Sequence, residues 1–407
     1  MILKTGHSLK DFPESWKTII DKTPVEIVKQ LAIAVSRFFQ RRQLYSDTQY
    51  EQKPGGKKIQ WPLIAISANH GDLALIQFVV NKIKLKNIRQ TERQIALFLV
   101  AFKGCTGCKR HQYLDIYDFL TSKLKDKNPG KKSPLNKEGR TPLHYAANNG
   151  NFKLCKLIIE GTSNKNPESI KEWRNTQSGH TPLHYAALKG HLEVCKLIMD
   201  NTTNKNPANL GLIGEEETPY HFAAKSGQLA VCQLFLDNLS DKNPGTKAMV
   251  TPLHKAAWNG HLEVCKLIMD NLIDKNPANA YPRQETPYHY AARKDKLAVC
   301  QLFYDTLLDK NPTTPDGLTP LHYAAENGHV EVCKLIMANL VDKNPRTGSG
   351  YGDRPTPLDL ATINKSYRNV DVATRNRKLE VCQLFHEHGI YINGHFPNPP
   401  SPFADVI

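Results

Sequence analysis

The residues that could do chemistry are histidines and cysteines, and most of them recur at fixed places along the chain. There are 16 His and 9 Cys among 407 residues, enough for metal ligation or for nucleophilic and acid–base catalysis. Six histidines close a tetrapeptide Thr-Pro-Leu/Tyr-His: His144, His184, His221, His254, His289 and His322. One repeated local role, the capping of a helix, explains them better than an active site, which needs different groups converging on one point. We therefore predict no enzyme and no cofactor.

Seven of the nine cysteines share one position in a predicted helix: Cys155, Cys195, Cys232, Cys265, Cys300, Cys333 and Cys382. Packed helices lie about 8–10 Å apart, whereas a disulfide needs Cα atoms within roughly 7 Å. The spacing predicts a ladder of buried free thiols, which is typical of proteins in a reducing compartment.

A separate short motif, Cys105-Thr-Gly-Cys108 with His111, has the spacing of a zinc knuckle. A structural zinc site needs four ligands, and no second pair follows this one. A turn that carries two thiols is the favoured interpretation, with zinc as the weaker alternative.

The tetrapeptide marks the elements that position these residues. It begins at Thr141, and its later copies begin at Thr181, Thr218, Thr251, Thr286 and Thr319, with Thr-Pro-Leu-Asp at Thr356. Thr is a good N-cap, and Pro fits the first position of a helix. An Ala pair, a Gly and an apolar segment with helical spacing follow, so each unit should be a short helix, a tight turn, a longer helix and a polar loop. Such units must stack to bury their apolar faces.

These residues resemble the ankyrin repeat, and the segment Gly260-His-Leu-Glu-Val264 carries the pattern clearly. The resemblance covers residues 134–393 in seven units and implies an all-α solenoid of stacked helix-turn-helix units. Two features depart from the family pattern: most loops end in Asp-Lys-Asn-Pro, and about a dozen extra residues separate Thr362 from Leu379.

We divide the chain into four parts. Residues 1–59 are expected to form a basic helical cap and residues 60–133 two degenerate repeats with an insertion, which makes about nine repeats with the seven of residues 134–393. Residues 394–407 are proline-rich and should be extended.

Charge is concentrated at the N-terminal end. Residues 1–130 hold 22 of the 54 Lys and Arg residues but 11 of the 39 Asp and Glu residues. The alternative function is therefore a regulatory protein whose basic N-terminal third binds nucleic acid or an acidic membrane surface. No apolar run reaches the roughly 20 residues of a membrane helix, so we expect a soluble, monomeric, cytoplasmic protein, with the nucleus as the alternative location.

The resemblance implies an adaptor or scaffold that holds a partner protein on the concave face of the array. In the family, contacts come from the residue before the tetrapeptide and from the two residues after the Ala pair. These positions vary between units here, and Trp and Arg are enriched in binding hot spots. We predict an exposed Trp at position 258 and this partner-binding set: Arg140, His180, Leu188, Lys225, Trp258, Arg293 and Glu326.

Overall fold

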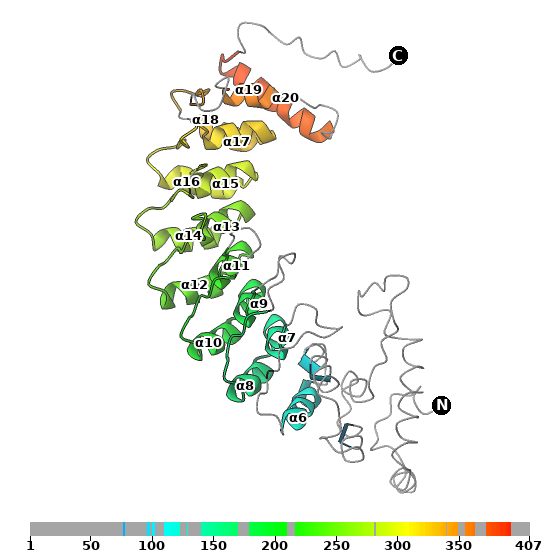
Figure 1. Cartoon of the computed structure of the whole chain (residues 1–407). Coiled ribbons are helices and arrows are strands. Elements are labelled where there is room, and N and C mark those ends of the chain that lie inside the picture. The colour runs from blue at the N-terminus through cyan, green and yellow to red at the C-terminus, as the bar shows by residue number, and fades with distance from the viewer. Residues whose placement is uncertain are drawn as a thin grey trace, which may run out of the picture. The chain divides into compact units, whose positions relative to one another are not determined.

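The computed structural model describes most of residues 110–391 and a few positions before them. The described ranges are residues 76–77, 96–97, 100–101, 110–122, 128, 140–169, 179–209, 216–280, 282–338, 340–348, 355–362 and 372–391. Fifteen helices and no strand lie within these ranges (Figure 1). The chain divides into two compact units, residues 1–204 and 205–407, which we describe separately.

Each repeat begins with a short helix that follows the Thr of the tetrapeptide. In the first unit these helices are α7 (Pro142–Asn148) and α9 (Pro182–Lys189). In the second unit they are α11 (Pro219–Lys225), α13 (Pro252–Asn259), α15 (Pro287–Arg293), α17 (Pro320–Asn327) and α19 (Pro357–Thr362). The Thr before α7, α9, α11, α13, α15 and α17 has extended backbone, with φ between −119° and −90° and ψ between 164° and 167°. This is the conformation of an N-cap, and Pro follows it at the first helical position as predicted.

A second helix follows in each repeat, and in the first six it comes directly after a tight turn. In the first unit these helices are α8 (Phe152–Glu160) and α10 (Leu192–Asp200). In the second unit they are α12 (Leu229–Asn238), α14 (Leu262–Asp270), α16 (Leu297–Thr306), α18 (Val330–Met337) and α20 (Val372–Glu387). The seven ladder cysteines all lie on these helices, and all are buried and free, which confirms that part of the sequence prediction.

In the first unit, α7 packs against α8 and α9, and α10 packs against α8 and α9. The helix α6 (Arg110–Thr121) contacts α8 and buries Ile116, Tyr117 and Leu120. Residues 1–59 lie outside the described ranges, and between 60 and 133 the structure describes α6 and a few single positions. The helical cap and the two degenerate repeats therefore stay predictions.

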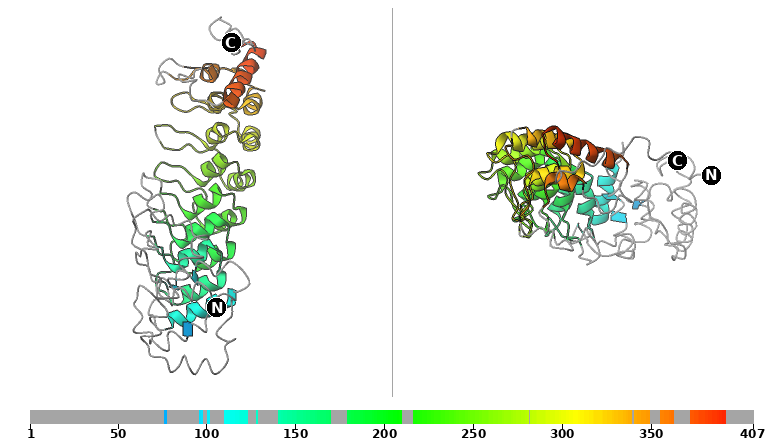
Figure 2. Two further views of the ribbon diagram at one scale, coloured as in Figure 1. Left: turned by 90° about the vertical axis from the view of Figure 1, so that its right-hand side faces the viewer. Right: turned by 90° about the horizontal axis from the view of Figure 1, so that it is seen from above.

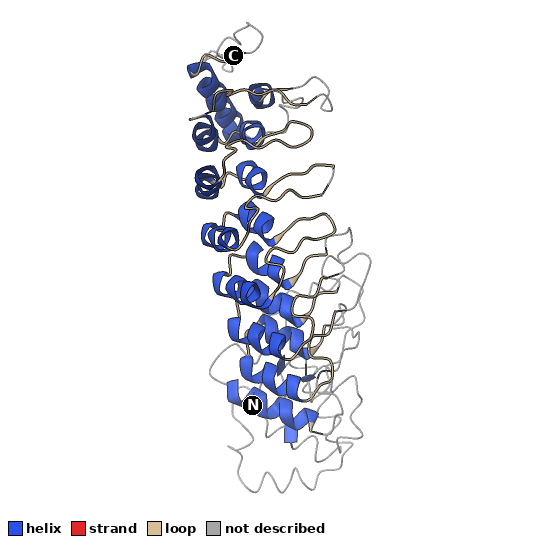
Figure 3. Cartoon of the chain, turned by 90° about the vertical axis from the view of Figure 1, so that its left-hand side faces the viewer, coloured by secondary structure: helices blue, strands red, loops and turns tan. Residues whose placement is uncertain are grey.

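In the second unit, the first helices pack side by side in the order α11, α13, α15, α17 and α19. The second helices α12, α14, α16, α18 and α20 form a parallel layer behind them, and Figure 2 shows the two layers from other directions. Between the layers lies the core, which includes the Ala pairs and fully buried rings such as Tyr220, Phe235, Tyr288 and Phe303. Within each unit the connecting loops leave the helices on one side (Figure 3).

The Asp-Lys-Asn-Pro loops are held by side chains that bond to backbone groups. At residues 241–244 the Asp241 Oδ1 accepts from the Asn243 N–H at 2.9 Å, and Lys242 Nζ donates to the Leu236 carbonyl at the end of α12 at 2.5 Å. The Asn243 Oδ1 then accepts from the Leu253 N–H of α13 at 3.1 Å. One tetrapeptide thus caps the end of one helix and the start of the next, which is why it can replace the usual family loop.

The last repeat differs in its second helix. Residues 363–371 lie outside the described ranges, but α20 begins at Val372, seven positions before Leu379, which aligns with the first residue of α14 and α16. Part of the predicted insertion therefore lengthens α20 at its N-terminal end.

Candidate partner-binding surface

The capping histidines fix the helices that present the surface. In the six complete tetrapeptides, the His Nδ1 accepts from the N–H of its own Thr at 2.9–3.2 Å. The Nε2 atom faces the neighbouring repeat: it lies 2.9 Å from the Val250 carbonyl oxygen for His221, and 3.1 Å from that of Glu285 for His254. Since Nδ1 accepts a hydrogen bond, the proton of His221 and of His254 is on Nε2, which donates to the carbonyl.

This arrangement keeps the capping histidines neutral. Burial lowers the pKa of His144 to about 3 and that of His221, His254, His289 and His322 to about 4. A second proton would also remove the acceptor on which the cap depends. These residues are structural, as the sequence predicted.

Other histidines bond backwards along the stack. His191 Nε2 lies 3.0 Å from the Asn148 carbonyl in the first unit, and His261 Nε2 lies 2.9 Å from the Lys225 carbonyl in the second. A Cβ on Gly150 would come within 2.6 Å of the His191 ring, so the turn requires Gly both for its positive φ of 68° and for this close approach.

The seven predicted binding residues are distributed over both units and differ in exposure. Arg140, Leu188, Trp258 and Arg293 are half-buried, and Lys225 and Glu326 are exposed. His180 is buried. Its side chain does not project outward, contrary to the sequence prediction.

Burial is shared by four of the residues that precede the tetrapeptide, whereas Arg140 and Val250 are half-buried. Like His180, Glu217, Glu285 and Leu318 are buried. For Glu217 and Glu285, the side chain that follows the histidine of the next repeat contacts this position, namely Lys255 and Tyr323. In the first unit the Arg140 guanidinium lies over the Tyr185 ring at 4.8 Å, and the His180 ring meets Tyr185 edge-on at 5.8 Å.

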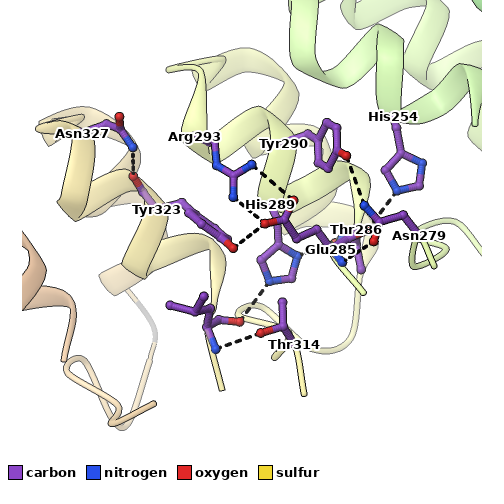
Figure 4. Close-up of polar contacts among 11 residues, drawn as sticks. His254, Asn279, Glu285, Thr286, His289, Tyr290, Arg293, Thr314, Tyr323 and Asn327 are labelled. Carbon is purple, nitrogen blue, oxygen red and sulfur yellow. Dashed lines mark hydrogen bonds and ion pairs between the residues drawn. The ribbon is translucent and has the colours of Figure 1, made fainter. Parts of the chain in front are cut away.

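In the second unit a buried ionic cluster occupies this position (Figure 4). Glu285 accepts from both ends of the Arg293 guanidinium, at 2.5 Å and 3.2 Å, and from the Tyr323 hydroxyl at 2.5 Å. The Arg293 guanidinium also lies 3.9 Å from the centre of the Tyr323 ring. Burial alone would raise the pKa of Glu285, but hydrogen bonds and charge from Arg293 and Tyr323 outweigh it and lower that pKa. Arg293 is therefore engaged within the chain.

The equivalent position two repeats earlier holds a simpler pair. Glu217 contacts Lys255 on α13 as a buried ion pair. Burial would raise the pKa of Glu217, but the charge and hydrogen bond of Lys255 outweigh it and lower that pKa. Lys255 stands where Tyr290 and Tyr323 stand in the two following repeats, so the pair replaces an aromatic contact.

Trp258 is half-buried. The sequence prediction of an exposed Trp is therefore wrong. Its ring meets Tyr290 edge-on at 5.5 Å, and Lys294 Nζ lies 4.2 Å from the ring centre. Tyr290 is itself fixed, since its hydroxyl accepts from Asn279 Nδ2 at 3.1 Å and its ring meets His254 at 5.1 Å. The result is an indole held in one place at the junction of α13 and α15, with a cation on its face.

Backbone strain falls in the same two repeats. Met249 and Gln284, two residues before Thr251 and Thr286, have φ of 55° and 46°. Gly179 and Gly317 occupy this place in other repeats, with φ of 74° and 77°. A non-glycine residue with such a φ is strained, and strain of this kind clusters at functional sites. Sequence reasoning missed both residues, although the loss of Gly two positions before the Thr was a usable signal.

Other predicted sites are not placed by the structure. Cys105 and Cys108 lie outside the described ranges, and of His111 only the backbone, in α6, is described. Among the described residues, no group of three or more His, Cys, Asp or Glu side chains could hold a metal ion. None of the helices in the described ranges is long and apolar enough to cross a membrane.

Comparison with known proteins agrees with the repeat geometry. The family described as "Ankyrin repeats (3 copies)" matches residues 107–209, 206–279, 271–347 and 288–395, which together span most of the chain. A search of curated proteins found no match to this sequence.

Proposed function

The chain belongs to the ankyrin-repeat family, and we propose that it is a non-catalytic adaptor that holds a partner protein on the first-helix surface of its second unit. We define this surface as the outward residues of α13 and α15 with the loops that precede them. Repeats of this family are generally protein–protein interaction modules. Function does not follow from fold alone, so the proposal rests on a particular site.

The observation that carries the proposal is the Trp258 cluster. A Trp ring that is already ordered by Tyr290 and Lys294 loses little side-chain entropy when a partner covers it. Trp is also among the residues most enriched in binding hot spots. The strained residues Met249 and Gln284 open the same two repeats and are exposed, which agrees with a surface kept for binding at some cost in stability.

The test is affinity capture with the full chain from cells that express it, followed by mass spectrometry. We expect Trp258→Ala to lose the partner, and binding to the purified partner to weaken by roughly 2 kcal/mol, the size of a hot-spot effect. The matched control is Glu263→Ala, which changes an exposed ion pair with Lys266 on the second helix of the same repeat. The proposal fails if Trp258→Ala and Glu263→Ala capture the same proteins equally well.

A salt titration separates this function from nucleic-acid or membrane binding by the basic N-terminal third. Phosphate contacts weaken steeply as ionic strength rises, whereas a surface built around Trp258 should not. Capture that disappears with nuclease or with moderate salt would favour the alternative function instead.

A further inference from the structure

Three successive repeats of the second unit carry a fully exposed aliphatic side chain at the same place. Ile273, Leu308 and Val341 lie just beyond α14, α16 and α18, and none is covered by its own chain. Single exposed aliphatic residues are common, but recurrence at one position in three consecutive repeats is a pattern. We call these three side chains the aliphatic row.

The fold does not require aliphatic residues at this place. The preceding repeats hold Ser163, Thr203 and Ser240 there, and these are exposed as well. The Asn of the loop caps the next first helix in both groups, at 3.1 Å for Asn243 after Ser240 and at 3.1 Å for Asn276 after Ile273. A hydroxyl residue therefore supports the same loop, and the aliphatic row needs another explanation.

Negative charge accompanies the row. Each member is followed by an exposed Asp, namely Asp274, Asp309 and Asp342. Two of the lysines that come next donate to backbone carbonyls: Lys310 Nζ to that of Tyr304 in α16 at 2.5 Å, and Lys343 Nζ to that of Leu340 at 3.1 Å. The row thus combines apolar knobs with carboxylates.

The spacing expected for the row is close to the length of one heptad of an α-helix. Neighbouring packed helices lie about 8–10 Å apart, so the row should advance by about that distance at each repeat. Seven residues of an α-helix advance about 10.5 Å. A helix that lies along the row would therefore present an equivalent gap between its own side chains once per heptad. Each aliphatic side chain of the row could pack into one such gap. In Figure 1 the loops after α14 and α16 project on one side of the unit.

We propose that the aliphatic row is a second docking surface, which binds an amphipathic helix of a partner protein that has Leu-type residues at heptad spacing and Lys or Arg on its flanks. The surface lies beyond the second helices and does not include Trp258, so it goes beyond the function proposed above. Carboxylates beside each knob disfavour an acidic membrane or a nucleic acid, which present negative charge themselves.

The probe is a fluorescein-labelled synthetic peptide of about four heptads, with Leu at its core positions and Lys at its flanks. Fluorescence anisotropy with the full chain measures binding. We expect the triple variant Ile273→Ser, Leu308→Ser, Val341→Ser to bind at least tenfold more weakly than the unchanged chain. The variant Asp274→Asn, Asp309→Asn, Asp342→Asn should also bind more weakly, and a peptide with Glu in place of Lys should not bind.

Both variants have natural precedents in this chain, since Ser240 and Asn204 occupy the corresponding places in earlier repeats. Urea unfolding of both should match that of the unchanged chain, and Trp258→Ala should bind the peptide normally. The proposal is overturned if the unchanged chain does not bind the Lys peptide, or if either variant or the Glu peptide binds equally well. It is also overturned if the row instead mediates binding to phosphatidylserine vesicles or self-association measured by sedimentation.

Discussion

The Nε2 atom of His254 lies 3.1 Å from the backbone carbonyl oxygen of Glu285, so the side chain that caps one helix also bonds the loop before the next. The same bridge joins His289 to the Leu318 carbonyl at 3.2 Å. The last tetrapeptide has Asp359 instead, whose carboxylate accepts from the Thr356 N–H at 2.9 Å. Asp can cap the helix, but its carboxylate has no N–H to donate to the next repeat.

Substitution of His254 can separate the two roles. Asn keeps an acceptor for the Thr251 N–H but loses the bridge to Glu285, whereas Ala loses both. We expect His254→Asn to lower the free energy of unfolding by about 1–3 kcal/mol, the cost of a buried carbonyl left without a partner. His254→Ala should cost roughly 1 kcal/mol more, the usual value of an N-cap. Urea unfolding measures both, and equal losses would show that the cap contributes nothing.

Stability should depend on pH through the buried histidines. The pKa of each of four of them, His221, His254, His289 and His322, is lowered to about 4 in the folded chain, from 6.5. The unfolded chain therefore takes up protons first as the pH falls below 6.5. The contribution of these neutral histidines to the free energy of unfolding is complete above pH 6.5. It is lost between about pH 6.5 and 4, by about 1.4 kcal/mol per pH unit for each histidine.

Urea unfolding at several pH values between 7.5 and 5 checks this sign. His289→Gln should reduce the slope of the free energy of unfolding against pH by about the contribution of one histidine. A free energy of unfolding that does not change over this range would rule out neutral, buried histidines in the folded chain.

The ladder cysteines should be inert in the folded protein. Burial raises the pKa of Cys195 and Cys232 to about 12 and raises those of Cys265, Cys300 and Cys333 further. Because the thiolate is the reactive form, a thiol reagent should find few reactive groups in native protein. All nine should react after denaturation without a reductant. Disulfides among the seven ladder residues would contradict the ladder.

Local patterns made much of this fold predictable. Thr251, Pro252 and His254 act within one turn of helix, so their role can be inferred without neighbours. The burial of Cys265 follows from helical periodicity in the same way. The candidate surface was harder to predict, because the burial of its residues depends on side chains of the next repeat. Glu285 is buried because Tyr323 and Arg293 close over it, and Trp258 is half-buried because Tyr290 stands beside it. No spacing within one repeat encodes the contacts that Tyr323 and Tyr290 make from the next repeat.

The contact between Trp258 and Lys294 allows a last prediction about the candidate surface. A surface Trp without partners would change stability by less than about 0.5 kcal/mol on truncation. Here the ring contacts Tyr290 and a cation, so Trp258→Ala should cost about 1 kcal/mol, and Lys294→Ala less. Because the two side chains share one contact, the double variant should cost less than the two single changes together, by about 0.5 kcal/mol. Urea unfolding of the four proteins measures this coupling. Strict additivity would mean that Lys294 does not hold the indole, and the argument that Trp258 is ordered before binding would then rest on Tyr290 alone.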